Sequence, residues 1–220
     1  MSQTSGKYAF LLRKLHSLSG IIPIGVYLLE HLFSNGMATR GPESFDKIVN
    51  LLTGLPFLLV IEFAVIVVPI LFHGIYGLFL TYEHQPNAAQ YNYYRNWLFH
   101  FQRWTGIIML IYIGWHVYTT RLMSIITGQH MSYEFMNNLL NNPTWGGFAF
   151  VFMIIGLAST VFHFSNGVWN FLIKWGITPG PDSQKWSLAF CTVVGWAMFF
   201  WGLAALFAMK GWWNYEWFVG

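Results

Sequence analysis

Charge is scarce in this chain. Only 9% of its 220 residues are Asp, Glu, Lys or Arg, whereas about 25% is usual for a soluble domain. The formal charge of +3 is small and is spread along the sequence, so it gives no sign of nucleic-acid binding. A soluble fold of this size would need more charge to cover its surface. The scarcity excludes an ordinary soluble domain, and we expect no nucleic-acid partner.

Cysteine is nearly absent too. The single cysteine, Cys191, lies in an apolar run, and one thiol cannot build a disulfide framework or a thiolate-bound zinc or iron–sulfur site. No Cys-x-x-Cys-His run is present, so covalent c-type haem is excluded. The sequence also lacks the Glu-x-x-His pairs of di-iron bundles. No nucleophile, base and orienting acid stand together in a pattern typical of hydrolases.

Long apolar runs are what the chain has instead. Several windows hold about 20 residues with almost no charge, enough to cross a bilayer as a helix at ~1.5 Å per residue. Trp and Tyr gather near the ends of these runs, as in an interfacial belt. The sequence therefore predicts an all-α integral membrane protein with a single domain, residues 1–220. Five transmembrane helices are expected at about 15–36, 56–82, 98–125, 146–174 and 186–210.

Basic residues near the predicted helix ends indicate the orientation, because cytoplasmic connections are usually the richer in Lys and Arg. With the N-terminus in the cytoplasm and the C-terminus outside, seven basic residues lie inside and four outside. The inner set is Lys7, Arg13, Lys14, Arg95, Arg103, Lys174 and Lys185. The outer set is Arg40, Lys47, Arg121 and Lys210. We therefore expect this orientation.

Four histidines lie in apolar runs, one in each of the first four predicted helices: His31, His73, His116 and His163. An unsatisfied polar group in hydrocarbon costs several kcal/mol, so these side chains are expected to face other helices. A single buried histidine can simply be hydrogen-bonded to a neighbouring helix. Four at matched depths are harder to explain in that way, and polar residues inside a membrane are functional candidates.

The depths of the four histidines divide them into two pairs. Counted to the nearest inner charge, His73 and His163 lie 10 and 11 residues away, roughly 15 Å. His31 and His116 lie 17 and 13 residues from inner charges, roughly 20–25 Å. Two pairs at two depths predict two bis-histidine haem b sites. His73 and His163 would ligate the inner iron, and His31 and His116 the outer iron.

Glycine and repeat patterns accompany the histidines. Phe-His-x-x-x-Gly occurs twice, and its glycines, Gly77 and Gly167, follow the histidine by four residues and would leave room for a flat porphyrin. Gly20 precedes His31 by 11 residues, close to one helix face. Small residues also serve close helix packing in membranes. The fifth span has neither histidine nor counterpart, so we expect a four-helix haem-binding bundle with one added helix.

Several motifs together resemble a known family. They are Arg13-Lys14-Leu15-His16-Ser17-Leu18-Ser19-Gly20, Glu30-His31, Phe72-His73-x-x-Tyr76-Gly77, Arg95-Asn96-Trp97, Gln102-Arg103-x-Thr105-Gly106, Trp115-His116-Val117 and Phe162-His163-Phe164-Ser165-Asn166-Gly167-x-Trp169. Over residues 8–210 the chain resembles the cytochrome b subunit of succinate dehydrogenase, in the five-helix, two-haem form of Bacillus-like bacteria.

This resemblance implies a function. The subunit would anchor a flavoprotein (FAD) subunit and an iron–sulfur subunit to the cytoplasmic face of the bacterial membrane. As the quinone-reducing part of an enzyme complex, it would pass electrons from succinate through two haems b to menaquinone. The inner pair would ligate the high-potential haem and the outer pair the low-potential haem. Lys174 resembles a lysine that pairs with haem propionates in related fumarate reductases. It could equally be an ordinary anchor at the membrane interface.

Quinone reduction also needs protons, so protonatable groups near the haems are candidates. Glu30 and Glu62 are intramembrane carboxylates, both expected toward the outer side, and each could instead reach water at a helix end. His16, at the inner edge of the first helix, could touch haem propionates or a second quinone, or else face headgroups or a partner. Three further histidines are expected in or near the connections and solvated: His84, His100 and His130.

Two alternatives stay open at this point. The same chemistry occurs in the cytochrome b of a fumarate reductase, hydrogenase or formate dehydrogenase, which the co-purifying subunits would reveal. A haem-free transporter with substrate-binding or proton-relaying histidines is the alternative from another class. Absence of visible absorbance would favour the transporter, although the repeated Phe-His-x-x-x-Gly fits it poorly.

Overall fold

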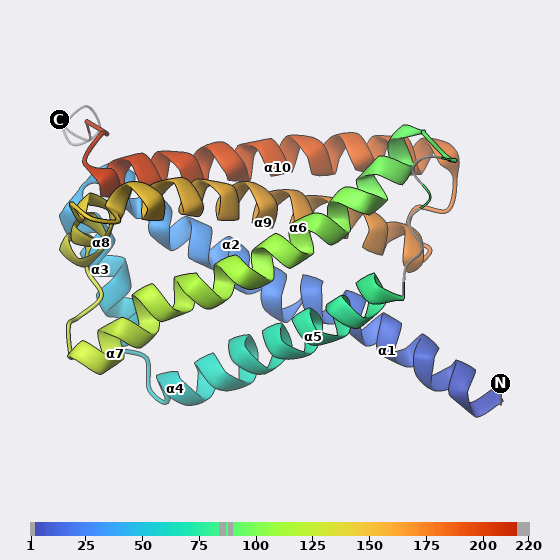
Figure 1. Ribbon diagram of the computed structural model, residues 1–220, viewed down its shortest axis with the longest axis horizontal. Coiled ribbons are helices and arrows are strands. Elements are labelled where there is room, and N and C mark those ends of the chain that lie inside the picture. Colours follow the sequence, from blue (N-terminus) through green and yellow to red (C-terminus); the bar gives the residue numbers. More distant parts are fainter. Residues whose placement is uncertain (1–2, 84–86, 88–89, 215–220) are drawn as a thin grey trace. The chain divides into compact units, whose positions relative to one another are not determined.

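The computed structural model of the chain describes residues 3–83, 87 and 90–214, and within them all the regular structure is helical (Figure 1). Four helical stretches are long and apolar enough to cross a membrane: Gly6–Arg40, Leu58–Tyr82, Gly146–Lys174 and Pro181–Lys210. The predicted class, an all-α integral membrane protein, is confirmed.

The first predicted span is two helices, α1 (Gln3–Ile21) and α2 (Pro23–Gly36), followed by a 3-10 turn, η1 (Met37–Arg40). It begins well before residue 15. The break falls at Pro23, which has no N–H to donate to the preceding turn and whose ring crowds the carbonyl four residues earlier.

The second span contains α4 (Leu58–Ile61), the π-helical segment η2 (Glu62–Val67) and α5 (Val68–Tyr82). The wide π turns lie immediately before Pro69. A π turn gives the proline ring room that a regular α-helical turn would not.

The third predicted span corresponds to α6 (Tyr94–Val117), a π-helical segment η3 (Tyr118–Leu122) and α7 (Met123–Thr127). It is not among the four most apolar helices of the described residues. Its polar side chains, such as Gln102 and Arg103, lower its mean hydropathy. The structure is consistent with five spans.

The remaining helices are α3 (Pro42–Thr53), α8 (Tyr133–Asn141), α9 (Gly146–Lys174) and α10 (Pro181–Lys210). Helix α8 lies in a stretch that is predicted to be a connection, because it is rich in Asn, a weak helix former. Ser132 caps α8: its hydroxyl accepts a hydrogen bond from the N–H of Phe135, at 3.1 Å.

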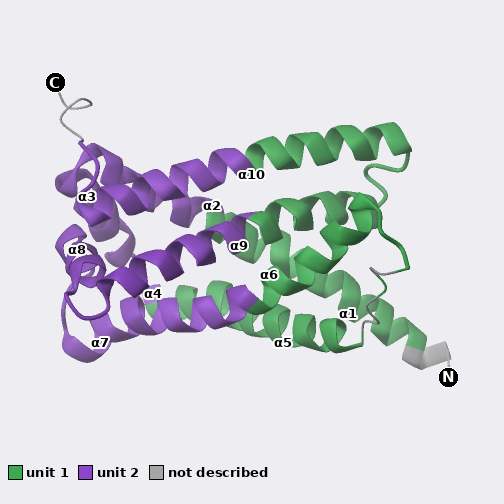
Figure 2. Ribbon diagram, turned by 45° about the horizontal axis from the view of Figure 1, so that its top comes forward, with its two compact units in different colours: residues 1–28, 59–107, 162–195 green, residues 29–58, 108–161, 196–220 purple. Residues whose placement is uncertain are grey.

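The chain divides into two compact units, coloured separately in Figure 2. Unit 1 contains residues 1–28, 59–107 and 162–195. Unit 2 contains residues 29–58, 108–161 and 196–220. His73 and His163 belong to unit 1, and His31 and His116 belong to unit 2. The division therefore separates the two histidine pairs that the depth argument predicts.

The core of unit 2 lies beneath α8. The buried side chains of Met136, Leu139 and Leu140 pack there with residues of α3, α9 and α10. At the end of α10, where carbonyls lack helical partners, side chains of α8 donate hydrogen bonds. The Tyr133 hydroxyl donates to the carbonyl of Ala208 at 2.6 Å. These bonds tie α8 to the last turn of α10.

Replacing Tyr133 with Phe should weaken this end of unit 2. The change removes one hydroxyl and leaves the Ala208 carbonyl without that donor, so the expected loss is about 0.5–1.5 kcal/mol. Thermal unfolding of the detergent-solubilised protein measures it. Tyr118→Phe is the matched control, because Tyr118 is 55% exposed. Equal melting temperatures for the two variants would show that the bond contributes nothing.

Candidate functional site: two buried histidine pairs

Each predicted histidine pair lies within one unit, with its two imidazole planes nearly perpendicular. The ring centres of His73, on α5, and His163, on α9, are 6.2 Å apart, with their planes at 79°. The ring centres of His31, on α2, and His116, on α6, are 5.9 Å apart, with their planes at 83°. The structure thus brings together the same pairs that the depths predict.

This spacing fits one metal ion between two imidazoles. A metal–imidazole bond is about 2.0–2.1 Å long, and a ring centre lies roughly 1.1 Å beyond its nitrogen, so two axial imidazoles have centres roughly 6.2–6.4 Å apart. The inner pair matches this value at 6.2 Å. The outer pair is within about half an ångström of it, at 5.9 Å.

The hydrogen bonds of the inner pair also suit a ligand role. The Nδ1–H of His73 donates to the carbonyl of His16 at 2.9 Å, and that of His163 donates to the carbonyl of Gln102 at 3.0 Å. A carbonyl oxygen only accepts, so Nδ1 carries the proton and Nε2 of the neutral ring carries the lone pair. A hydrogen bond from the other ring nitrogen is the usual way in which a metal-binding imidazole is oriented.

In the described part of the chain, no three side chains among His, Cys, Asp and Glu converge as a metal-binding group. A structural zinc ion usually takes four protein ligands. Two opposed imidazoles suit a metal whose other four ligands belong to a macrocycle, as in haem. The donor set of both pairs therefore fits haem.

An aromatic ring supports the outer pair. Tyr112 stacks on His116, with ring centres 5.4 Å apart and planes at 23°. Gly156 of α9 makes room for it, because a Cβ there would lie 2.3 Å from a Tyr112 ring carbon. The Thr120 hydroxyl donates to the His116 carbonyl at 2.6 Å. The orientation of His116 thus depends on packing between α6 and α9.

Comparison with known proteins identifies the family. The family model described as the succinate dehydrogenase/fumarate reductase transmembrane subunit matches residues 81–204. The chain is 42% identical to the succinate dehydrogenase cytochrome b558 subunit of Bacillus subtilis (strain 168) over 204 residues, which is 93% of this chain and 98% of that relative. This chain belongs to that family. It is a multi-pass membrane subunit of the succinate dehydrogenase type.

Within this succinate dehydrogenase subunit, His16 lies against the inner pair. Its ring stacks on His73, with ring centres 4.0 Å apart and planes at 11°. A Cβ at Gly77 would lie 3.1 Å from Nε2 of His16, and one at Gly167 would lie 3.4 Å from Nε2 of Gln102. The two glycines of the Phe-His-x-x-x-Gly repeat therefore face the side chains at positions 16 and 102.

Gly20 lies against the inner pair. A Cβ at Gly20 would lie 2.6 Å from Cε1 of His73. Gly20 thus belongs to the surroundings of the inner pair.

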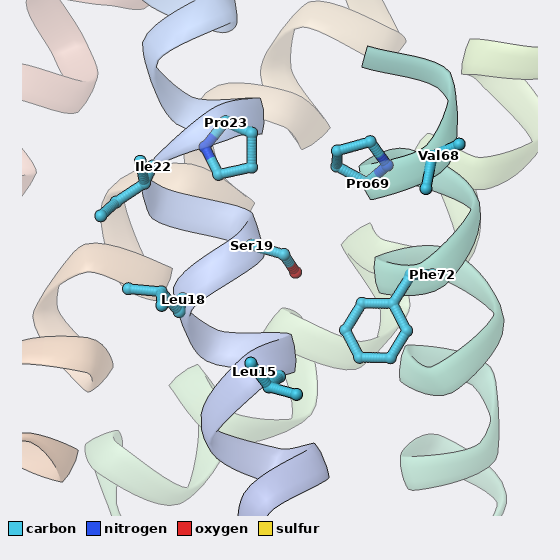
Figure 3. Close-up of a pocket in the computed structure, with 8 residues that line it drawn as sticks. All are labelled: Leu15, Leu18, Ser19, Ile22, Pro23, Val68, Pro69 and Phe72. Atoms are coloured by element: carbon cyan, nitrogen blue, oxygen red, sulfur yellow. The ribbon is translucent and has the colours of Figure 1, made fainter. Parts of the chain in front are cut away.

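An apolar pocket of about 420 Å³ flanks the inner pair between α1 and α5. Figure 3 shows Ser19 pointing into this space, with Pro69 and Phe72 on the opposite helix. The Ser19 hydroxyl lies 3.3 Å from Nδ1 of His73. The two kink-forming prolines of these spans, Pro23 and Pro69, both line the pocket.

Basic side chains gather at the cytoplasmic end predicted for unit 1. Lys174 is the exposed last residue of α9, and it lies in the electrostatic field of Arg13, Lys14 and Arg103. Lys14 donates to the Lys174 carbonyl at 2.7 Å, and Arg13 pairs with Glu83 at 3.2 Å. The cluster carries more positive than negative charge and suits carboxylates such as haem propionates.

The carboxylates singled out by the sequence lie in different units. Glu30, half-buried beside His31 in unit 2, accepts a hydrogen bond from the hydroxyl of Ser34. Glu62 is half-buried at the first residue of η2, in unit 1. Glu30 is thus adjacent in sequence to a member of the outer pair.

Two features of the site differ from what the sequence predicts: the contacts of Gln102 and the burial of His100. Gln102 donates to the carbonyl of His163 at 3.0 Å and accepts from Asn166 at 2.6 Å. Its sequence signals are an amide at the start of a predicted span and its place in the motif Gln102-Arg103-x-Thr105-Gly106. His100, expected to be solvated, is buried because α6 begins at Tyr94 and includes it. His130 is exposed as predicted, and His84 lies outside the described residues.

The added fifth helix, α10, also contributes. The indole N–H of Trp201 donates to the carbonyl of Leu32 at 2.9 Å, beside His31. A Cβ at Gly36 would lie 2.2 Å from Nε1 of Trp201, so this close approach needs glycine. Helix α10 therefore supports the part of α2 that carries His31.

Proposed function

We propose that this chain is the di-haem membrane anchor of a succinate dehydrogenase, which passes electrons from an iron–sulfur partner to menaquinone. In this proposal His73 and His163 ligate an inner haem b, and His31 and His116 ligate an outer one. The observation that supports it most is the ring-centre separation of each pair, 6.2 and 5.9 Å. Bound between two imidazoles, a haem b supplies reversible one-electron transfer.

The chain's own residues hold and surround these groups. Nε2 of His73 and Nε2 of His163 would bind the inner iron, while their Nδ1 atoms donate to backbone carbonyls. Lys174 and its basic neighbours would hold the propionates of the inner haem. Apolar helix faces surround both pairs and lower the local dielectric around the imidazoles.

The proposed setting follows from the charges. The N-terminus lies in the cytoplasm and the C-terminus outside the bacterial cytoplasmic membrane, because the predicted inner connections carry more Lys and Arg. The flavoprotein and iron–sulfur subunits bind the cytoplasmic face, near the basic cluster around Lys174. The family to which the chain belongs is defined by membrane subunits of such complexes.

Quinone reduction requires protons as well as electrons, and three side chains are candidate donors. Glu30 is the donor proposed for the outer side, since it adjoins His31 and is held by Ser34. Glu62 is the second carboxylate candidate. His16 is the candidate on the inner side, stacked on His73.

The haem content of the purified complex tests this proposal. A pyridine haemochrome assay should give about two haems b per chain, and succinate should reduce them and then a menaquinone analogue. One haem per chain, or none in a well-folded protein, would refute it. The family description also covers fumarate reductase. Rates of succinate oxidation and fumarate reduction in the same complex give the preferred direction.

A further inference from the structure

The two inner histidines have matching surroundings on two different helices. On α1, residues 16, 19 and 20 face His73; on α6, residues 102, 105 and 106 face His163. In each set the first residue offers its backbone carbonyl to the imidazole Nδ1, at 2.9 and 3.0 Å. We call these two segments, residues 16–20 and 102–106, the imidazole cradles.

A hydroxyl follows three residues after each carbonyl. Ser19 Oγ lies 3.3 Å from Nδ1 of His73, and Thr105 Oγ1 lies 3.4 Å from Nδ1 of His163. Each hydroxyl also contacts the carbonyl of its own cradle, at 3.0 Å for Ser19 and 3.3 Å for Thr105. Each Nδ1 therefore has a carbonyl and a hydroxyl as neighbours.

A glycine ends each cradle directly beneath the ring. A Cβ at Gly20 would lie 2.6 Å from Cε1 of His73, and a Cβ at Gly106 would lie 3.1 Å from Cε1 of His163. Both distances are below ordinary van der Waals contact, so the imidazole rests on the backbone of the neighbouring helix. Any side chain at either position would turn the ring.

We propose that the two cradles are positioning elements that fix the protonated nitrogen and the ring plane of His73 and of His163. This inference rests on the proposed function, in which these two rings ligate the inner haem. The carbonyl fixes the proton on Nδ1. The close contact with the glycine and the nearby hydroxyl fix the plane of the imidazole ring. Together they hold the two planes at 79°.

Close helix packing through small residues does not account for this pattern. Packing glycines would contact the backbone or varied side chains of the facing helix, whereas both cradle glycines contact the same imidazole atom. The outer pair differs: the buried Nδ1 of His116 has no hydrogen-bond partner among the described residues. The cradle is thus not a general feature of histidines in this chain.

Glycine substitutions in the purified complex test the contact between each cradle glycine and its imidazole ring. The measurement is the electron paramagnetic resonance spectrum of the ferric protein, in which the largest g value reports the angle between the axial imidazole planes. Gly20→Ala should shift the largest g value of the inner signal, Gly106→Ala should shift it less, and the outer signal should not change. Gly114→Ala, on α6, is the matched control, because a Cβ there meets nothing within 4 Å.

Hydroxyl substitutions test the cradle if Gly20→Ala fails to assemble. Ser19→Ala and Thr105→Ala should each change the midpoint potential of the inner haem component, the one held by His73 and His163. The potential of the outer haem component should stay as in the wild type. Ser19→Thr and Thr105→Ser should keep the wild-type potential, because each introduces the hydroxyl that already serves the other cradle. A merely structural role would not give this rescue.

The outcomes separate this inference from the proposed function. If His73→Ala removes the inner component while the glycine and hydroxyl variants match Gly114→Ala, the haem assignment stands and the cradle proposal is wrong. A haem-free wild-type protein would instead refute the proposed function. Graded changes confined to the inner component support both.

Discussion

Replacing His73 or His163 with Ala should halve the haem content, from about two to about one per chain, and remove one and the same spectral component. Each variant deletes one of the two imidazoles that would hold the inner haem, whose ring centres lie 6.2 Å apart. Succinate-dependent quinone reduction should fall to background, because the inner haem lies between the partner subunits and the outer haem in the proposed path. Difference spectra and the pyridine haemochrome assay measure the haem loss.

The complementary variants make this result specific. His31→Ala and His116→Ala should remove the other component and leave the inner one intact. His130→Ala is the matched control, since His130 is exposed and belongs to neither pair. If His31→Ala removed the same component as His73→Ala, the pairing of the four histidines would be wrong.

Replacing Gly156 with Ala should disturb the outer pair through Tyr112. The added Cβ would lie 2.3 Å from a Tyr112 ring carbon, and Tyr112 stacks on His116 with ring centres 5.4 Å apart. Overpacking of this kind typically costs about 1–3 kcal/mol. We expect a lower melting temperature and a changed or missing outer component, measured by thermal unfolding and by low-temperature visible spectra.

A glycine on the same helix provides the control for this prediction. Gly147 belongs to α9, and a Cβ there would meet nothing within 4 Å. Gly147→Ala should therefore be neutral or stabilising by up to about 1 kcal/mol, through helix propensity alone. The double variant Gly156→Ala with Tyr112→Leu should regain part of the lost stability, since the smaller side chain gives room back. Identical behaviour of Gly156→Ala and Gly147→Ala would contradict the proposed contact.

The membrane class and the pairing of histidines could be predicted because they depend on simple counts. Apolar length fixes the spans, and residues per turn fix the depth of each histidine. The structure places His73 beside His163 and His31 beside His116, as those depths predict. That these pairs bind haem stays a prediction.

The contacts between helices could not be predicted in the same way. The spacing of Gly20 and His31 along the helix gave no sign that Gly20 lies under His73 of another helix. The contacts of Gln102 could not be predicted, because they depend on a backbone carbonyl and on an amide of another helix. Helix α8 was missed since tertiary packing overrides the weak helix propensity of its asparagines.

The spectrum of the oxidised wild-type complex tests the central claim most directly. When two axial imidazole planes are nearly perpendicular, each ring acts on a different iron d orbital, and the two orbitals stay close in energy. Planes at 79° and 83° therefore predict two low-spin ferric resonances of large g anisotropy, one for each histidine pair. A high-spin resonance, a single low-spin signal or the rhombic signal of parallel imidazoles would contradict the account.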